Sequence, residues 1–330
     1  MTLGILGIYN STMTDTAKTD LIQLALGLQE LDSEKTNPAS EQLDTLSPLE
    51  IATLMNAEDH KIAEAVEKVL PQIGQAIEAA ARALRAGGRI IYTGAGTSGR
   101  LGVLDAAEVP PTFSAPPDMV IGLIAGGNAA MFKAQEGIED SAEQGAKDLR
   151  MVNVSATDFV VGLAASGRTP YVLGAMREAQ EAGAKTAGIS CNTHSPLAQL
   201  CDIPITPIVG PEILSGSTRL KSGSAQKQIL NMISTGAMVK IGKCYGNRMV
   251  DLNASNKKLQ GRAINLVADL SKSDRKAALA ALIATEWNIK AAILMQACGG
   301  DLDANAAIKR VEDFGGHLRS AIEASKVLDC

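Results

Sequence analysis

The sequence predicts an α/β fold: a doubly wound, mostly parallel sheet with N-terminal helices and a small C-terminal helical subdomain. Short apolar runs alternate with helical patterns between residues 89 and 242, as in proteins built from βαβ units. Glycine-rich segments stand between several of these strands and the helices that follow. The chain has 330 residues, of which 46% are hydrophobic and 20% charged, so it is long enough to bury a sizeable core. We divide it into an N-terminal arm (1–45), a sheet domain (46–250) and a C-terminal helical subdomain (251–330).

The N-terminal part of the chain changes character near residue 46. Residues 1–45 are polar and mixed, which predicts an extended or partly helical arm. The SPLE segment at 47–50 has the Ser, Pro and Glu spacing of a capped helix start. Apolar residues repeat with a helical period from about 63 to 85, and this predicts a second helix that ends at the glycine pair 87–88.

The alternation after this glycine pair predicts the sheet. We expect strands at residues 89–93, 118–124, 158–164, 185–190 and 203–208. We expect the intervening and following helices at residues 100–108, 128–149, 169–182 and 217–242. Ligands of such sheets bind at the carboxyl ends of the strands, so we look for the site there.

The rest of the chain, from residue 251 onward, is predicted to be helical. Helix starts are expected at Ser271, Asn288 and Asp303, which are residue types that cap helices. The glycine pairs at 299–300 and 315–316 are expected to interrupt these helices.

Charge and hydropathy exclude several classes of partner. The 31 basic and 36 acidic residues give a net charge of −5, so no global basic field favours nucleic acid or an anionic membrane. No apolar run approaches the ~18 residues that a membrane span needs. An anionic ligand would therefore have to be held by local groups.

The cysteines and histidines argue against disulfides and metal. The 5 cysteines are odd in number, widely spaced and without a CxxC pair, so neither a disulfide framework nor a zinc site is expected. The 3 histidines share no metal-ligand spacing. These observations favour a reducing cytoplasm and a site without metal.

The first glycine-rich loop, GAGTSG at 94–99, matches G-x-G-x-x-G between a strand and a helix. A dinucleotide site would also need an acidic residue at the far end of the second strand to hold the ribose. Asp118 stands at the beginning of that strand instead, and its end is Ala125-Gly126-Gly127. The dinucleotide interpretation is therefore weak.

A second loop of the same kind, ASGRTP at 165–170, follows the third strand, so Ser-Gly-Arg occurs twice. Hydroxyl groups and free backbone N–H groups at a helix N-terminus favour one phosphate group. Either loop alone is equally well explained as a capped turn between strand and helix, but two in one sheet favour phosphate binding. The expected ligands of the substrate are Gly96, Thr97, Ser98, Ser166, Gly167, Arg168 and Thr169.

These loops and the segments around them resemble the sugar isomerase (SIS) domain, and specifically the N-acetylmuramic acid 6-phosphate etherases. The resemblance runs from about residue 34 to the end of the chain. The segments that carry it are LDTLSPLEI (43–51), GAGTSGRLG (94–102), DAAEVPPTF (105–113), LIAGG (123–127), EGIEDS (136–141), AASGRTPYV (164–172) and GPEILSGSTRLKSGSAQK (210–227). The last segment is the most specific.

The resemblance implies a reaction and a pair of catalytic residues. The family cleaves the D-lactyl ether of N-acetylmuramic acid 6-phosphate to N-acetylglucosamine 6-phosphate and D-lactate, as a homodimer and without metal or organic cofactor. By the resemblance, Glu108 is the proton donor or exchanging acid/base, and Glu139 is its partner. We expect one of them in an apolar setting that keeps its carboxyl protonated. The apolar neighbours of Glu108 point to that residue.

Several further residues have two explanations each. Arg168 and Lys221 supply either the positive charge for a phosphate or a structural ion pair. Glu212 and Ser217 either line the pocket or cap the long helix. The family often has Cys at position 109 and Glu at position 128, where this chain has Val109 and Asn128.

Two other function classes remain open at this stage. A sugar-phosphate isomerase on the same scaffold removes the same C2 proton but needs no leaving group. A noncatalytic sugar-phosphate sensor is the second class, because SIS domains serve in transcription regulators and in the glucokinase regulatory protein. Residues 1–60 contain no basic helix-turn-helix segment, and the paired glutamates favour an enzyme.

Overall fold

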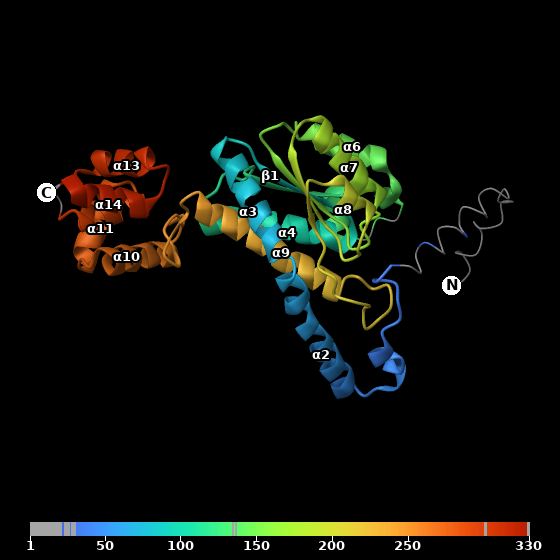
Figure 1. The fold of residues 1–330 in the computed structure, drawn as a ribbon. Coiled ribbons are helices and arrows are strands. Elements are labelled where there is room, and N and C mark those ends of the chain that lie inside the picture. The colour runs from blue at the N-terminus through green and yellow to red at the C-terminus, as the bar shows by residue number, and fades with distance from the viewer. Residues whose placement is uncertain are drawn as a thin grey trace, which may run out of the picture.

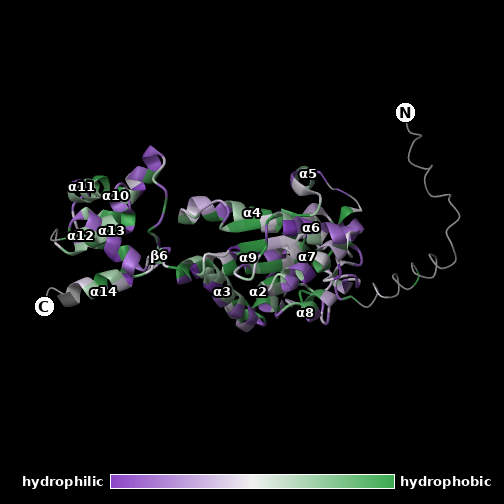
Figure 2. Ribbon diagram, turned by 90° about the horizontal axis from the view of Figure 1, so that it is seen from above, coloured by the Kyte–Doolittle hydropathy of each residue, from purple (hydrophilic) through white to green (hydrophobic). Residues whose placement is uncertain are grey.

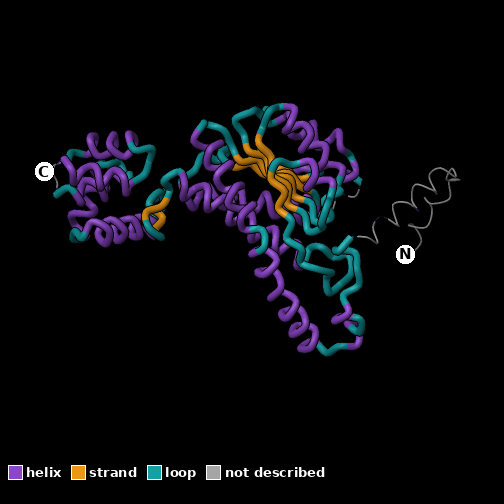
Figure 3. The backbone as a smooth tube through the Cα atoms, in the orientation of Figure 1, coloured by secondary structure: helices purple, strands orange, loops and turns teal. Residues whose placement is uncertain are grey.

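A computed structural model describes residues 31–133, 135, 137–299 and 302–328, together with Ile22 and Gly27. Its centre is a 5-stranded parallel sheet in the order β2-β1-β3-β4-β5 (Figures 1 and 3). The strands are β1 (Ile90–Gly94), β2 (Val120–Ile124), β3 (Phe159–Leu163), β4 (Lys185–Ile189) and β5 (Ile203–Ile205). The predicted α/β class is confirmed, and the last strand is shorter than expected.

Helices cover both faces of the sheet, as parallel strands require. On one face, Ile90 and Tyr92 of β1 pack in the same buried cluster as residues of α3 (Leu70–Arg85), α4 (Gly96–Phe113) and α9 (Lys221–Lys240). On the other face, Ile91 packs with α6 (Ala142–Met151), α7 (Pro170–Glu181) and α8 (Pro196–Leu200). Figure 2 shows the hydrophobic residues concentrated in the strands between these helices.

The N-terminal helices differ from the prediction in one boundary. Ser47 and Glu50 form the expected capping box at the start of α2 (Pro48–Glu67). The helix predicted over 63–85 is in fact the end of α2 followed by α3, which begins at Leu70. Pro71 explains the break, because a proline lacks the N–H of a continuous helix and clashes with the preceding turn. Figure 1 shows α2 extending away from the sheet.

The segment that precedes α2 packs on the sheet domain. Ser33 donates its N–H to Asn192 Oδ1 at 3.2 Å, and Asn37 Nδ2 donates to the carbonyl of Pro211 at 3.2 Å. Two short 3-10 turns, η1 (Pro38–Ser40) and η2 (Leu43–Thr45), connect this segment to α2. Most of the predicted N-terminal arm, residues 1–30, lies outside the described residues apart from Ile22 and Gly27.

Three predicted boundaries around the site are corrected. Helix α4 begins at Gly96, inside the predicted loop, and continues to Phe113. It ends later than expected because Pro110 and Pro111 are accommodated in its last turns. Helix α9 begins at Lys221 instead of 217.

The helix predicted over 128–149 is three separate elements. They are α5 (Gly127–Phe132), the 3-10 turn η3 (Ile138–Asp140) and α6. Gly137 has φ = 80°, a left-handed conformation that interrupts a helix and that glycine adopts without strain. Glu139 therefore lies in a short turn.

The C-terminal part forms a helical unit with its own buried cluster, which includes Val250, Leu282 and Leu294. A short hairpin of β6 (Cys244–Tyr245) and β7 (Arg248–Met249), which the sequence did not reveal, precedes it. The helices are α10 (Lys257–Ser271), α11 (Arg275–Ala284), α12 (Ile289–Ala297), α13 (Ala304–Asp313) and α14 (Leu318–Leu328).

The caps of these C-terminal helices test the predicted starts. Asn288 and Asp303 accept backbone N–H groups at the starts of α12 and α13, so both predicted starts are confirmed. The start predicted at Ser271 is wrong, because Ser271 ends α10 and Asp274 caps α11.

Candidate active site

The two glycine- and serine-containing loops lie side by side at the carboxyl edge of the sheet. Strand β1 pairs with β3 in parallel, and Gly94 at the end of β1 is opposite Leu163 at the end of β3. The chain enters α4 directly after β1 and α7 shortly after β3. The structure therefore brings together residues 96–98 and residues 166–169, as expected from the sequence.

The first loop depends on close packing of strand and helix. A side chain on Gly94 would meet the backbone of Gly99 at 2.8 Å, and one on Gly99 would meet the carbonyl oxygen of Gly94 at 2.6 Å. Only glycine at both positions lets α4 begin this close to β1. The Ser98 hydroxyl, in the first turn of α4, donates to Gln226 Oε1 of α9 at 2.8 Å.

The second loop turns just as tightly. Gly167 has φ = 67°, and a side chain there would collide with Ser195 at 2.3 Å. The backbone N–H of Arg168 donates to Ser166 Oγ at 3.2 Å. Thr169 is the N-cap residue of α7, and Pro170 occupies its first turn.

The N-termini of α4 and α7 carry no side-chain cap. A side chain caps each of α10, α11, α12 and α13, whereas α3 and α5 also begin without one, so it is the meeting of the α4 and α7 starts at one edge that sets them apart. The first N–H groups of α4 and α7 are therefore free of a capping side chain at the edge where the two loops meet. Such donors and the helix dipoles favour an anion.

Lys221 does not face this anion site as a free cation. Its side chain is only 2% exposed, and its ammonium group donates to Glu58 of α2. Lys61 also donates to Glu58, at 2.6 Å. Burial alone would raise the pKa of Glu58, but the hydrogen bonds from the two lysines outweigh burial and hold the pKa at about 2. Of the two explanations for Lys221, the structure favours the ion pair.

Glu212 caps the long helix α9. Its side chain is completely buried, with Oε2 accepting from Lys221 N at 3.0 Å and Oε1 accepting from Ser222 N at 2.9 Å. These are N–H groups at the start of the helix, which have no carbonyl partner within it. The capping explanation therefore holds for Glu212, whereas Ser217 lies in the turn before the helix.

Glu108 lies on an exposed face in the second half of α4. The expectation that its apolar neighbours surround the carboxyl group does not hold within one chain. Ala106 and Val109 are buried against the sheet, but Glu108 is rotated away from them on the helix. It borders a cavity of about 400 Å³ between α4, α9 and the hairpin, beside Asn231, Thr235 and residues 244–249.

A buried polar network stands next to Glu108. Asp105, one turn earlier, accepts a hydrogen bond from Tyr92 OH at 2.9 Å and from Asn231 Nδ2 at 2.6 Å. Ser234 Oγ donates to the same carboxylate at 3.2 Å. Burial, the nearby charge of Asp105 and its hydrogen bond raise the pKa of Tyr92 well above its ordinary value. This network fixes α4 against β1 and α9.

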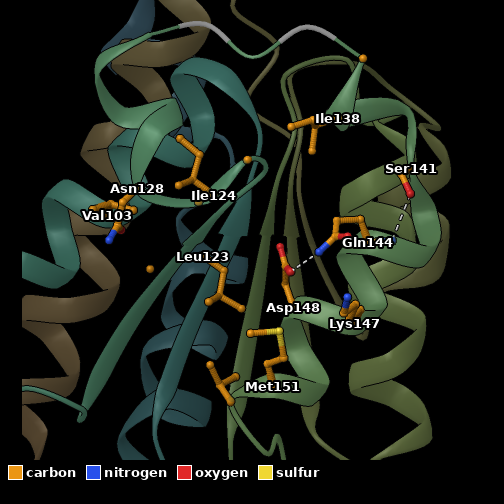
Figure 4. A pocket seen from close by; sticks show the side chains of 15 residues that line it. Val103, Leu123, Ile124, Asn128, Ile138, Ser141, Gln144, Lys147, Asp148 and Met151 are labelled. Atoms are coloured by element: carbon orange, nitrogen blue, oxygen red, sulfur yellow. Dashed lines mark hydrogen bonds between the residues drawn. The ribbon is translucent and has the colours of Figure 1, made fainter.

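Glu139 is also exposed, in the turn η3 that packs near α7. Its neighbour Ile138 lines a cavity of about 710 Å³ beside the edge strand β2. Figure 4 shows Leu123 of β2 on one side of this cavity, with Gln144 and Asp148 of α6 on the other. Gln144 donates to one oxygen of Asp148, and Tyr171 OH donates to the other at 2.7 Å.

One chain does not bring Glu108 to the two loops. At 1.5 Å per residue, the ten residues from Ser98 to Glu108 separate them by about 15 Å along the axis of α4. Glu108 therefore lies almost three helical turns along α4 from the residues that the carboxyl edge of the sheet assembles.

Sequence reasoning missed two residues of this edge. Gln226 contacts Ser98, and Asn192 Nδ2 donates to the carbonyl of Ala165 at 2.9 Å. The sequence signal for Gln226 is a glutamine on a helix face that otherwise carries apolar residues such as Ile229 and Ile233. No local pattern indicates the role of Asn192.

No group of three or more His, Cys, Asp or Glu side chains within the described residues is placed to hold a metal ion. In the same part of the chain, no helix combines the length and the apolar character needed to cross a membrane.

Comparison with known proteins places the chain in a family. Residues 62–180 match the glucokinase regulatory protein N-terminal SIS domain, and residues 130–234 match the SIS domain. A protein of Serratia proteamaculans named N-acetylmuramic acid 6-phosphate etherase is 56% identical over 90% of this chain and 99% of its own length. Proteins of the same name from Pectobacterium atrosepticum and Cronobacter sakazakii are 54% identical, again over 90% of this chain and over 97% and 100% of theirs. The chain belongs to the N-acetylmuramic acid 6-phosphate etherase family.

Proposed function

We propose that this protein is a carbon–oxygen lyase that cleaves the D-lactyl ether of N-acetylmuramic acid 6-phosphate. The products are N-acetylglucosamine 6-phosphate and D-lactate, as in the recycling of cell-wall amino sugars. The observation that carries the proposal is the meeting of two uncapped helix N-termini, those of α4 and α7, at one edge of the sheet. The family relationship over nearly the whole chain supports it.

The phosphate group of the substrate binds between the two loops. Residues 96–98 offer backbone N–H groups and the hydroxyls of Thr97 and Ser98, and residues 166–169 offer Ser166, Gly167, Arg168 and Thr169. The guanidinium of Arg168 supplies the positive charge, because Lys221 is committed to Glu58. A dianionic phosphate is thereby held by helix dipoles, hydroxyls and one cation.

The chemistry uses the aldehyde of the open-chain sugar. The C2 proton lies α to the C1 aldehyde, and the lactyl ether oxygen lies on C3, so a base that removes the proton allows elimination. The C3–O bond breaks, a proton is delivered to the departing lactate oxygen, and a C2–C3 double bond forms. Water then adds to C3 while C2 regains a proton, which restores the sugar. Two acid/base groups account for every proton in this sequence, and neither metal nor organic cofactor is required.

Glu108 and Glu139 are the two acid/base groups of this proposal. Glu108 donates a proton or exchanges it with C2, and Glu139 handles the water. Both carboxyl groups are exposed in the single chain, so the water-poor environment that an acid needs must form on substrate binding or on association of two chains.

The site is completed by a second copy of the chain, so the working form is a homodimer. Within one chain, about 15 Å of helix separates Glu108 from the loop at Ser98. Leu104, one turn before Glu108 on the same helix face, is 48% exposed, as expected for a surface that a partner covers. The extended helix α2 offers further surface for a partner (Figure 1). In this arrangement, Glu108 of one copy faces the sugar held by the loops of the other.

We assign a separate role to each of the three parts of the chain. Residues 46–250 form the sugar-phosphate-binding unit and residues 251–330 the helical subdomain, a division that the separate buried clusters support. In the predicted N-terminal arm, residues 1–45, the described segment around Ser33 packs at the edge that carries the loops. The free thiols of Cys191, Cys201, Cys244 and Cys298 fit a cytoplasmic location.

The experiment that tests the function is incubation of the purified protein with N-acetylmuramic acid 6-phosphate. D-lactate is measured with D-lactate dehydrogenase, and the sugar phosphate is identified by mass spectrometry. Stoichiometric release of D-lactate and N-acetylglucosamine 6-phosphate is expected. Binding without release would indicate a sensor, and interconversion of aldose and ketose phosphates without release would indicate an isomerase.

A further inference from the structure

We propose that Gln226 is a positioning residue for phosphate binding, which controls where the hydroxyl proton of Ser98 points. The proposal rests on the proposed function, because it takes Ser98 as a ligand of the substrate's phosphate. It adds a residue of the long helix α9, separated from Ser98 by 128 positions in the sequence, to the machinery of the first loop.

The geometry shows a half-satisfied amide beside this loop. Gln226 is completely buried, and its Oε1 accepts the hydroxyl of Ser98 at 2.8 Å. Its Nε2 is buried as well and has no hydrogen-bond partner among the described residues. A buried amide group without a partner costs free energy that an apolar side chain of similar size would avoid. A glutamine at this position therefore needs a reason other than packing.

The reason for a glutamine here is that the Ser98 hydroxyl has a single proton, which it cannot donate to Gln226 and to a phosphate at the same time. A serine hydroxyl has one proton, and in the structure this proton goes to Gln226 Oε1. A phosphate oxygen accepts hydrogen bonds only, so Ser98 has to release this proton from Gln226 before it binds the ligand.

A half-turn of the Gln226 carboxamide solves the problem. It exchanges Nε2 for Oε1 without moving the backbone, so that Nε2 donates to Ser98 Oγ and the hydroxyl proton is free to point at the phosphate. In this step Nε2 gains Ser98 as its partner and Oε1 loses it, so the amide keeps one hydrogen bond in either orientation and the bound phosphate decides which orientation prevails. Phosphate binding and the rotated amide thus favour one another, and this coupling is the role that we assign to Gln226.

Two substitutions separate this role from simple packing. Gln226→Met keeps the length of the side chain and removes both hydrogen-bonding groups. Gln226→Glu keeps an acceptor for Ser98, cannot donate when ionised, and adds a negative charge near the phosphate. Gln226→Met is expected to raise KM and the inhibition constant of inorganic phosphate about fivefold, the effect of losing the neutral hydrogen bond by which Nε2 holds the Ser98 hydroxyl toward the phosphate, with a smaller effect on kcat. Gln226→Glu is expected to raise both constants further.

The controls are a neighbouring glutamine and a double-mutant cycle. Gln228→Met changes a glutamine two positions along the same helix and is expected to leave phosphate binding unchanged. If Gln226 acts through Ser98, the variant with both Ser98→Ala and Gln226→Met binds phosphate no more weakly than Ser98→Ala alone. Calorimetric binding of inorganic phosphate gives the same comparison without turnover, and thermal melting identifies any variant that fails to fold.

The outcomes distinguish this inference from the proposed function. If Ser98→Ala leaves the inhibition constant of phosphate unchanged, the phosphate site itself is wrong. If Ser98→Ala weakens phosphate binding but Gln226→Met and Gln226→Glu both bind as the unaltered protein does, the role of Gln226 is overturned while the site stands. The role of Gln226 is also overturned if adding Gln226→Met to Ser98→Ala weakens phosphate binding by the same factor as Gln226→Met does alone. That result would show that Gln226 acts independently of Ser98.

Discussion

The ammonium group of Lys221 forms an ion pair with Glu58, and both side chains are at most 5% exposed. Lys221 is the first residue of α9, and Glu58 lies in the middle of α2. The pair therefore joins the helix that extends away from the sheet to the helix that carries Gln226. A lysine in the most family-specific segment of the sequence thus holds the fold together at the edge of the site.

Replacing Lys221 alone is expected to destabilise the protein strongly. Lys221→Met leaves the carboxylate of Glu58 buried without its buried cation, and removing one member of a buried pair costs about 3–5 kcal/mol. Denaturant unfolding of Lys221→Met and of the matched exposed control Lys227→Met measures the difference. The double variant Glu58→Met/Lys221→Met should regain much of the loss, and equal stability of Lys221→Met and Lys227→Met would contradict the assignment.

The ion pair of Lys221 and Glu58 also predicts that the protein loses stability in acid. The pKa of Glu58 is about 2 in the folded protein and near 4.5 in the unfolded chain, so the unfolded state takes up the proton first as the pH falls. The stabilisation is complete above about pH 4.5 and is lost as the pH falls toward 2. At about 1.4 kcal/mol per pH unit, roughly 3 kcal/mol is at stake. The free energy of unfolding should fall less across this pH range in the Glu58→Met/Lys221→Met variant than in the unaltered protein. An equal fall in both proteins would contradict the prediction.

Cys191, at the end of β4 near the loops, is expected to be unreactive in the native protein. Burial raises the pKa of Cys191 to about 12, and burial does the same for Cys201. Alkylation requires the thiolate, so iodoacetamide at pH 8 should leave both unmodified while the half-buried Cys298 reacts. Mass spectrometry of peptides, with a sample unfolded in guanidinium as the control, checks this. Rapid modification of native Cys191 would show that the site opens.

A shared active site predicts complementation between two inactive variants. Glu108→Gln should abolish turnover and leave sugar-phosphate binding largely intact, and Arg168→Ala should weaken binding of the phosphate. Random pairing of the two chains makes half of the dimers mixed, and each mixed dimer has one of its two sites intact. Co-refolded at equal amounts, the two variants should regain about a quarter of the unaltered activity.

The control for complementation is a pair of variants at one position. Glu108→Gln mixed with Glu108→Ala should regain nothing, because no intact site forms in any combination. If Glu108→Gln and Arg168→Ala together give only the sum of their separate activities, Glu108 and Arg168 act within the same chain. Loss of sugar-phosphate binding in Glu108→Gln would make Glu108 a structural residue.

The sequence predicted the sheet well, because strands buried on both faces appear as continuous apolar runs. It also predicted that residues 96–98 and 166–169 meet, since loops at the carboxyl ends of neighbouring parallel strands share an edge. It failed for Glu139, because the helical pattern over 128–149 gives no sign that Gly137 adopts a positive φ. The two-residue strands of the hairpin are too short for any period to reveal.

Side-chain environments were harder to predict than elements. The apolar neighbours of Glu108 suggested burial, but Ala106 and Val109 point to other sides of α4. The partners of Lys221 and Ser98, which are Glu58 and Gln226, stand 163 and 128 positions away, so no local spacing could reveal them. Contacts between helices of this kind depend on how the helices cross, which a single sequence does not specify.

The central claim, cleavage of the sugar-side carbon–oxygen bond, is tested most directly with isotopic water. The protein is incubated with N-acetylmuramic acid 6-phosphate in oxygen-18 water, and mass spectrometry follows the label in both products. Elimination followed by hydration predicts D-lactate without label and N-acetylglucosamine 6-phosphate with one oxygen-18 at C3. Label in the lactate, or no release of lactate from a bound sugar phosphate, would contradict the account.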